Sequence, residues 1–284
     1  AAGCFTFAAA ALPGTPQTLN VTPIPYLGTT VTAGAAIGII CGIIGIVMIC
    51  VYMYWEAARA RAAGDGFVAD TATLETMARA DEMGANINPF VALIPILVII
   101  VLLVGLQINV LISMLAGSLV CVLLFFKNVK NVSGLLGDSI QSATNAAITI
   151  GCIVGYGSVV SASTGYATLS AALLSLDAPP LISYGLTTTI LAGAAGSGTG
   201  GLAIALENLA PQYLAMGIPA ELLHRIGCLS AIGLDSLPHC GAVVVLLTLA
   251  GMTHKDSYKQ IFVTTVVITL IVAAIGNALA TIMY

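Results

Sequence analysis

Long apolar runs almost free of charge dominate this sequence. Several reach the roughly 17–25 residues needed to cross a ~30 Å hydrocarbon core. Only 7% of the 284 residues are charged, whereas a soluble domain carries about 25%. The runs do not alternate with a period of two, which argues against a transmembrane barrel. The sequence therefore predicts an all-α polytopic membrane protein. The runs cover residues 1–29, 31–55, 90–106, 110–126, 145–176, 181–210, 218–250 and 260–283.

Three of these runs are broken by stretches rich in glycine, proline and polar residues, at 11–20, 195–201 and 233–241. Inside lipid, a broken helix leaves backbone N–H and C=O groups that cost about several kcal/mol each unless protein, water or a ligand satisfies them. Half-helix N-termini after a break offer donors to a carboxylate. For one break, a glycine hinge or tight helix crossing is an equal alternative. Three breaks together favour a binding site.

The breaks carry side chains suited to a small polar solute. An aspartate inside a span costs about 2.5–3.5 kcal/mol on insertion scales and is functional by default. Asp235 and His239 meet on one face if their turn stays helical, and such a pair can exchange a proton near neutral pH. The alternative is that Asp235 only ties down the broken backbone. The predicted substrate-binding residues are Thr15, Gln17, Asn20, Ser197, Gly198, Thr199, Gly200, Ser236 and His239, with proton coupling assigned to Asp235 and His239.

Two further charged residues are candidates. Glu207 follows the second break and could face the solute, bind a cation or lie near the outer surface. For Arg225, an ion pair with Glu221 four residues earlier is favoured over substrate binding. His254 and Asp256 are expected to be solvated in an inner loop.

The seven cysteines lie in or beside apolar runs, without metal-ligand or paired-loop spacing. We expect them to pack as small apolar residues. The sequence predicts no metal and no cofactor, with a proton as coupling ion and sodium as the alternative. The expected partners are a lipid bilayer and a small solute, and not nucleic acid.

The cations orient the chain. If 31–55 runs inward and 90–126 returns as a hairpin that turns at Gln107 and Asn109, every Lys and Arg except Arg225 faces the cytoplasm, as the positive-inside rule requires. For Lys255 and Lys259 to face the same side, the chain must cross the membrane an even net number of times between 131 and 251. One crossing at 145–176, a re-entrant hairpin at 181–215 and one crossing at 218–250 meet this condition. The residues concerned are Arg59, Arg61, Arg79, Lys127, Lys130, Lys255 and Lys259.

Residues 3–14 resemble residues 227–241 in order and, in this topology, run in the opposite direction, as in inverted repeats. The chain opens inside an apolar run without an initiator Met, so we expect the C-terminal portion of a longer protein. The predicted parts are 1–55, the end of a first repeat (broken helix 1–29, helix 31–55); 56–89, a cytoplasmic linker; 90–126, a two-helix scaffold hairpin; and 127–284, the rest of a second repeat. This last part comprises an amphipathic interfacial helix 132–147, a helix 145–176, the re-entrant hairpin 181–215, a broken helix 218–250 and a last helix 260–283.

The segments LPGTPQTLN, GSGTGG and HRIGCLSAIGLDSLPHCGAVVVLLTLAGMTHKDSYKQIF, in that order, resemble the gluconate:proton symporter (GntP) family of the ion transporter superfamily. The resemblance implies two inverted repeats, each with a re-entrant hairpin and a broken helix, in a bacterial inner membrane. It also implies proton-coupled uptake of hydroxylated monocarboxylates, with the three breaks as the site. The helix before the Gly-Ser tip lacks the arginine that gluconate permeases carry. The chain therefore looks closer to permeases for short hydroxyacids such as 3-hydroxybutyrate.

We therefore expect a proton symporter, not an enzyme, that imports a small hydroxy-monocarboxylate and forms a homodimer through residues 31–126. Gluconate or another sugar acid, and sodium-coupled carboxylate uptake, are the nearest alternatives. An intramembrane serine hydrolase, with Ser197 as nucleophile and His239 or His224 as base, is a more distant one. A passive channel is another.

Overall fold

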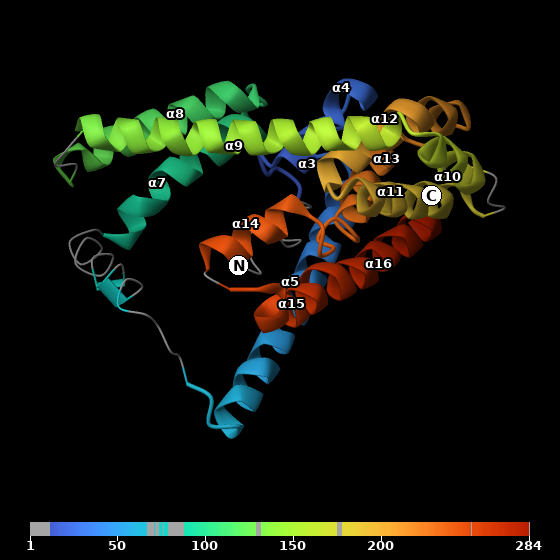
Figure 1. Cartoon of the computed structure of the whole chain (residues 1–284). Coiled ribbons are helices and arrows are strands. Elements are labelled where there is room, and N and C mark those ends of the chain that lie inside the picture. Colours follow the sequence, from blue (N-terminus) through green and yellow to red (C-terminus); the bar gives the residue numbers. More distant parts are fainter. Residues whose placement is uncertain are drawn as a thin grey trace. The chain divides into compact units, whose positions relative to one another are not determined.

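The computed structural model describes most of the chain. Within that part, the only regular secondary structure is helical (Figure 1). The predicted all-α class is confirmed. The chain divides into two compact units, Ala1–Cys50 with Ile140–Tyr284, and Val51–Ser139, and each is treated by itself below. The described residues are 12–66, 88–128, 132–174, 178–250 and 252–283, with single positions 71, 74, 75, 77 and 78.

Some sequence-based expectations lie outside the described residues. These include the first half of the internal echo, residues 3–11, and two of the cations used to orient the chain, Arg79 and Lys130. The inverted-repeat arrangement therefore stays a prediction.

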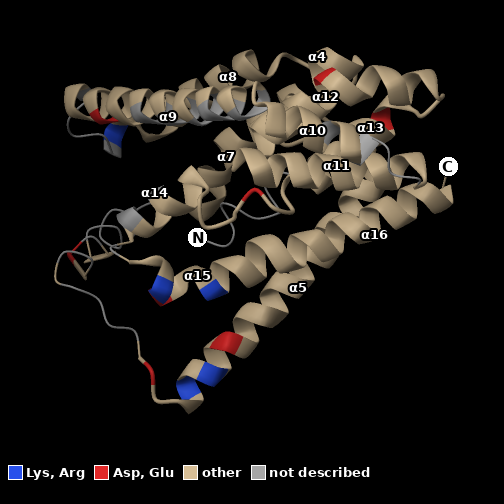
Figure 2. Cartoon of the chain, turned by 45° about the vertical axis from the view of Figure 1, so that its right-hand side comes forward, with Lys and Arg blue, Asp and Glu red and all other residues tan. Residues whose placement is uncertain are grey.

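Two helices in the described part are long and apolar enough to cross a membrane, judged by length and composition alone. One is α5 (Ala35–Ala62), with a mean hydropathy of 2.7. The other runs without interruption from His254 to Met283, with a mean hydropathy of 2.3. It consists of α15 (His254–Phe262), the π-helical turn η3 (Val263–Val267) and α16 (Ile268–Met283). Figure 2 shows its Lys, Asp and Lys residues gathered on α15, whereas α16 carries no charge.

The smaller unit contains a helical hairpin. α7 (Pro89–Ile100) continues as the π-helical turn η1 (Val101–Gly105), and α8 (Val110–Phe125) packs against it. The turn lies at Gln107, whose φ of 52° reverses the chain. The Asn109 side chain caps α8 by accepting a hydrogen bond from the Leu111 N–H at 2.9 Å. The chain thus turns at the polar pair that interrupts this apolar stretch. A short 3-10 helix η2 (Phe126–Asn128) follows.

A single helix, α9 (Val132–Ser161), occupies the region after residue 131, and α10 (Thr164–Leu174) follows it. The sequence instead predicts an interfacial helix 132–147 and a separate helix 145–176. No proline falls within α9 to divide it there. The interruption comes at Ser163, whose hydroxyl caps the first turn of α10.

The next two helices form a closely packed hairpin, α11 (Pro180–Ala195) and α12 (Gly198–Ala215). Gly196 ends α11 in the left-handed region with a φ of 61°, a conformation that favours glycine. The Ser197 hydroxyl then caps α12 by accepting a hydrogen bond from the Gly200 N–H at 3.1 Å. A side chain at Gly201 would overlap the backbone of Ala192. The hairpin therefore depends on glycine at its tip and at its helix crossing.

Two adjacent glycines test this packing. We expect Gly201→Ala to destabilise the protein by about 1–3 kcal/mol, because a Cβ there forces α11 and α12 apart. The matched control is Gly200→Ala, whose Cβ would make only ordinary contacts with Ser197, at 3.4 and 3.5 Å. The measurement is thermal unfolding in detergent. Equal melting temperatures for the two variants would contradict the close crossing.

The region after the hairpin contains a second long interruption. α13 (Ala220–Ala231) ends before a non-helical stretch, residues 232–240, and the chain becomes helical again in α14 (Gly241–Leu249). α13 packs against both α11 and α16. Small residues permit the close approach, since a Cβ at Gly227 would lie 2.6 Å from Tyr184 Oη.

Two isolated helical turns, α3 (Thr18–Val21) and α4 (Ile24–Leu27), lie at the end of the first break and directly after it. Both pack against α12 and α13. Gly28 and Gly34 have positive φ, 64° and 59°, and reverse the chain between these turns and α5. The larger unit therefore places the first break directly against the hairpin and the helix that precedes the third break.

Candidate functional site

The three broken segments meet at the tip of the hairpin. Gly198, the first residue of α12, is buried there. A Cβ built on Gly198 would lie 2.8 Å from Asp235 Oδ2, 2.9 Å from Leu19 Cδ1 and 3.1 Å from the Ala231 carbonyl oxygen. Leu19 belongs to the first break and Asp235 to the third. The separate breaks of the sequence are thus parts of one place in the fold.

His239 also contacts the same tip. Its Nε2–H donates a hydrogen bond to the Gly193 carbonyl at 3.0 Å. Its ring also lies against Gly196, where a Cβ would come within 2.9 Å of the imidazole Cδ2. The turn between α11 and α12 therefore packs against the third break at two points, through Asp235 and through His239.

Asp235 has a single hydrogen bond among the described residues. Its Oδ1 accepts from the Ser236 hydroxyl at 2.7 Å, and Ser236 is almost fully buried. No Lys, Arg or His in the described part forms an ion pair with this carboxylate. A carboxylate without a cationic partner in an apolar setting is expensive. Asp235 is therefore the charged group of this site that most needs a counter-ion, a proton or a donor from a ligand.

Asp235 and His239 do not pair with each other, although both lie in the described residues. Their side chains bond to Ser236 and to Gly193 respectively. Pairing requires a helical turn from 235 to 239, and the backbone there is non-helical, as Pro238 favours. The carboxylate–imidazole pair expected from their spacing is absent, and the two side chains contact the hairpin tip separately.

The polar residues of the first break bond to carbonyls of that break and of the loop that follows it. Thr15 Oγ1 donates to the Leu12 carbonyl at 2.9 Å. Asn20 is fully buried, and its Nδ2 donates to the Thr15 and Val31 carbonyls, both at 2.9 Å. Gln17 is exposed. Asn20 therefore ties the first break to the loop before α5.

α13 fastens the first break through buried side chains. Asn20 Oδ1 accepts a hydrogen bond from His224 Nε2–H at 3.3 Å, and Thr29 Oγ1 lies 2.7 Å from His224 Nδ1. Arg225 is fully buried, and it donates through Nε and Nη2 to the Ala33 carbonyl at 2.9 and 2.7 Å. These bonds give the polar groups of a broken backbone the partners that lipid cannot supply.

The ion pair expected between Arg225 and Glu221 does not form. Both residues lie in the described part, yet Glu221 is exposed at the start of α13 while the Arg225 guanidinium turns inward to backbone carbonyls. The Arg225 head group binds the loop before α5. It therefore stabilises the chain next to the first break.

The remaining predicted residues lie on α12 or just before it. Ser197 Oγ is engaged as the helix cap, and neither His224 nor His239 is hydrogen bonded to it. A serine nucleophile needs such a base within hydrogen-bond reach, so this geometry does not favour a hydrolase. Thr199 is half-buried beside the tip, and Glu207 is exposed farther along the helix.

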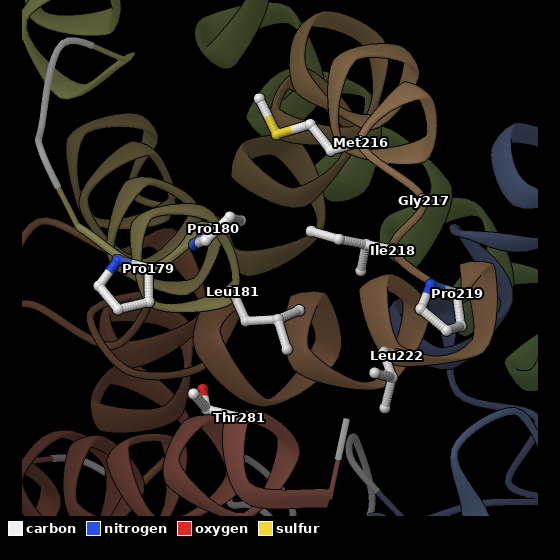
Figure 3. Close-up of a pocket in the computed structure, with 9 residues that line it drawn as sticks. All are labelled: Pro179, Pro180, Leu181, Met216, Gly217, Ile218, Pro219, Leu222 and Thr281. Atoms are coloured by element: carbon white, nitrogen blue, oxygen red, sulfur yellow. The ribbon is translucent and has the colours of Figure 1, made fainter.

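Two cavities lined by described residues of the larger unit lie away from this tip. Figure 3 shows one of about 340 Å³ around the opposite end of the α11–α12 hairpin. It is lined by Pro179, Pro180, Leu181, Met216, Gly217, Ile218, Pro219, Leu222 and Thr281. The other, of about 310 Å³, lies between α11 and α16 beside Asn277. Neither contains a predicted site residue. Among the described residues no group of His, Cys, Asp and Glu could hold a metal ion.

Two residues on α15 contact the third break and were not expected to do so. His254 Nε2–H donates to the Pro238 carbonyl at 3.0 Å, and the Tyr258 hydroxyl donates to the Ser236 carbonyl at 3.1 Å. The sequence-based reading placed His254 in solvent. The available signal was the i, i+4 spacing of two aromatic donors on a short polar helix.

Similarity to a known protein bears on what this site does. The chain is 29% identical over 319 aligned positions to the uncharacterized transporter YxjC of Bacillus subtilis (strain 168). The alignment covers 97% of this chain and 67% of that transporter. This chain is a distant homologue of a transporter. No family model and no solved structure matches it.

The homology and the apolar helices agree. A transporter works in a membrane, and the described part contains α5 and the helix from His254 to Met283, both long enough to span one. The chain is thus a distant homologue of a transporter, and its described part contains apolar helices long enough to span a membrane. Its own function is proposed below.

Proposed function

We propose that this chain is the substrate-binding part of a secondary active transporter that imports a small hydroxy-monocarboxylate, such as 3-hydroxybutyrate, together with a proton. The observation that carries the proposal is the meeting of three helix breaks around Gly198. Broken helices whose ends converge inside a transporter supply backbone groups for a solute and its coupling ion.

The N-terminus of α12 suits an anionic solute. The first N–H groups of a helix have no acceptor within the helix, and they carry its positive dipole end. α12 begins at Gly198, beside Asp235. The hydroxyls of Thr199 and Ser197 lie at the same place in the chain and offer partners for hydroxyl groups of a solute.

Proton coupling follows from putting two carboxylates at one helix end. A substrate carboxylate and the Asp235 carboxylate repel each other unless one of them carries a proton. No cation in the described residues neutralises Asp235. Binding of the anion therefore favours simultaneous binding of a proton, which is the physical requirement for symport. His239, bonded to the Gly193 carbonyl, shapes the pocket in this scheme.

Counterflow and uptake in proteoliposomes test the proposal. The full-length protein should concentrate a labelled short hydroxyacid inside the vesicles when the outside is acidic, and the external medium should become more alkaline as uptake proceeds. A panel of 3-hydroxybutyrate, lactate, gluconate and a dicarboxylate identifies the substrate class. Uptake that does not respond to a proton gradient would overturn the coupling.

Three alternatives have distinct outcomes. Gluconate preferred over short hydroxyacids would indicate a sugar-acid carrier. Dependence on sodium, tested by replacement with choline, would indicate that the broken-helix carbonyls bind Na⁺ instead. Equilibration without accumulation would indicate a channel. A serine-directed phosphonate that labels Ser197 would revive the hydrolase.

We further propose a bacterial inner-membrane location, with α15 on the cytoplasmic side, where Lys255 and Lys259 satisfy the positive-inside rule. A homodimer through residues 31–126 is proposed on the length of exposed apolar helix in α7 and α8. Labelling of α15 from one side of the membrane tests the proposed orientation. Cross-linking of the purified protein in nanodiscs tests the homodimer.

A further inference from the structure

The third break is fastened at two carbonyls by one face of α15. Tyr258 and His254 lie one helical turn apart, and they donate to the carbonyls of Ser236 and Pro238, two residues apart in the turn. Because the helix is interrupted between residues 232 and 240, these carbonyls need partners from elsewhere. In a continuous helix, backbone N–H groups of the following turn would donate hydrogen bonds to these carbonyls. Here the side chains of α15 donate them instead.

α15 is itself held in a defined position. The N–H and hydroxyl of Thr253 both donate to Asp256 Oδ2, at 2.8 and 2.6 Å, and complete a capping box at the start of the helix. The rings of His254, Tyr258 and Phe262 follow one another along the helix with centroid separations of 5.6 and 6.0 Å. The two donors are therefore presented together on a fixed face.

The contacts made by α15 lead from exposed residues to buried ones next to the carboxylate. His254 and Pro238 are exposed, Tyr258 is half-buried, and Ser236 is almost fully buried. The Ser236 hydroxyl in turn donates to Asp235. Cys240 is buried and forms a small apolar cluster with Val243 and Leu247, against which Tyr258 packs. Ser236 therefore receives the Tyr258 bond at its carbonyl and bonds to Asp235 through its hydroxyl.

The first and third breaks are held in opposite ways. Asn20, in the first break, and Arg225, in α13, bind the Val31 and Ala33 carbonyls of the following loop through fully buried bonds. Loss of these bonds would strand polar groups away from water. The bonds from His254 and Tyr258 are exposed or partly buried, so water can take their place when they break. The bonds from His254 and Tyr258 can therefore break and re-form at a lower free-energy cost than the buried bonds of Asn20 and Arg225.

We propose that His254 and Tyr258 form a latch on the 236–238 turn, and that its release opens the Asp235 site toward the α15 side. They act as positioning residues for the transport cycle proposed above, on which this role rests. The latch itself is a property of the fold, so it can be measured without knowing the substrate.

The native cysteines report on the latch. Full-length protein in proteoliposomes is treated with N-ethylmaleimide, which crosses membranes, and the labelling rate of each cysteine is read by mass spectrometry of its peptide. Cys240 belongs to the buried cluster against which Tyr258 packs. We expect Tyr258→Phe, which removes only the hydroxyl, to raise the labelling rate of Cys240 about fivefold, the change that corresponds to one ordinary hydrogen bond. We expect His254→Ala to act in the same direction.

Three controls separate a latch from general loosening. Cys228, fully buried and bonded to the Leu19 carbonyl at 3.2 Å, should keep its slow rate in every variant. His254→Gln retains an N–H donor and should behave more like the unaltered protein than His254→Ala does. Lys255→Ala, at an exposed neighbouring position on α15, should change nothing.

The labelling rates distinguish a latch from contacts that only stabilise the whole unit. Faster labelling of Cys240 alone supports the latch, whether or not hydroxyacid uptake is ever detected. An unchanged Cys240 rate in both Tyr258→Phe and His254→Ala overturns it. A rise at Cys228 as large as that at Cys240 also overturns it, because the contacts would then only stabilise the whole unit. Failure of the proposed symport appears separately, as absence of proton-driven uptake in the unaltered protein.

Discussion

Asp235→Asn is expected to abolish proton-driven accumulation of the substrate and to leave exchange of substrate across the membrane measurable. Asparagine has the shape of a protonated carboxyl group, so the site at Gly198 can still form and bind the anion. It cannot release a proton, however, and the symport cycle stops at that step. Net uptake should fall to the level of protein-free liposomes, while counterflow of labelled against unlabelled substrate continues.

The matched control is Glu207→Gln, which removes another carboxylate from the same hairpin at an exposed position. It should retain both net uptake and counterflow. Loss of counterflow as well as uptake in Asp235→Asn, at unchanged expression, would mean that Asp235 only ties down the break. Unaltered uptake in Asp235→Asn would contradict the assignment of the proton to this residue.

The second large effect is on stability. Arg225→Met is expected to lower the stability of the protein by about 3 kcal/mol, because two hydrogen bonds from a charged group to the Ala33 carbonyl are lost, each worth about 1.5–3 kcal/mol. Removal of the guanidinium also removes its cost of burial, which offsets part of this loss. Thermal unfolding in detergent measures the difference.

Arg59→Met is the matched control, because Arg59 is exposed and forms an ion pair with Glu56 at 3.6 Å. Exposed pairs contribute about 0–1 kcal/mol, so its melting temperature should barely change. Arg225→Lys keeps the charge and loses the planar arrangement of donors, and should lie between the two. A melting temperature for Arg225→Met equal to that for Arg59→Met would show that the loop does not depend on this residue.

The helical class and the positions of the breaks could be predicted because their causes are local. Proline removes a backbone donor, and glycine permits the left-handed turn seen at Gly196. An apolar run needs no partner to be recognised. The same local logic led to the division of 132–176 into an interfacial helix and a span, where the structure has the continuous α9. An amphipathic pattern indicates which face is polar, and it carries no signal for where a helix stops.

The partners of the site residues could not be predicted, because most of them are backbone atoms far away in the chain. A local pair, Glu221 with Arg225, was the natural reading of i, i+4 spacing. Arg225 instead reaches a carbonyl that precedes it by 192 positions, and a carbonyl has no signature in a sequence. The same holds for His254 and Tyr258. Asp235 and His239 failed to pair for the converse reason, since the helical turn that would join them is the one that Pro238 helps to break.

The distance along the chain between the first break and α13 also has a consequence for biosynthesis. Cys228 bonds to Leu19 in the first break, and Arg225 bonds to Ala33 in the loop that follows it. These bonds span 209 and 192 positions. At a synthesis rate of roughly 5–20 residues per second, this interval corresponds to about 10–40 s. During that time the loop around Asn20 and Ala33 has left the ribosome while its partners have not been made. The nascent segment must wait in water, at the insertion machinery or with a chaperone, and a ribosome that pauses before α13 would prolong its exposure to quality-control proteases.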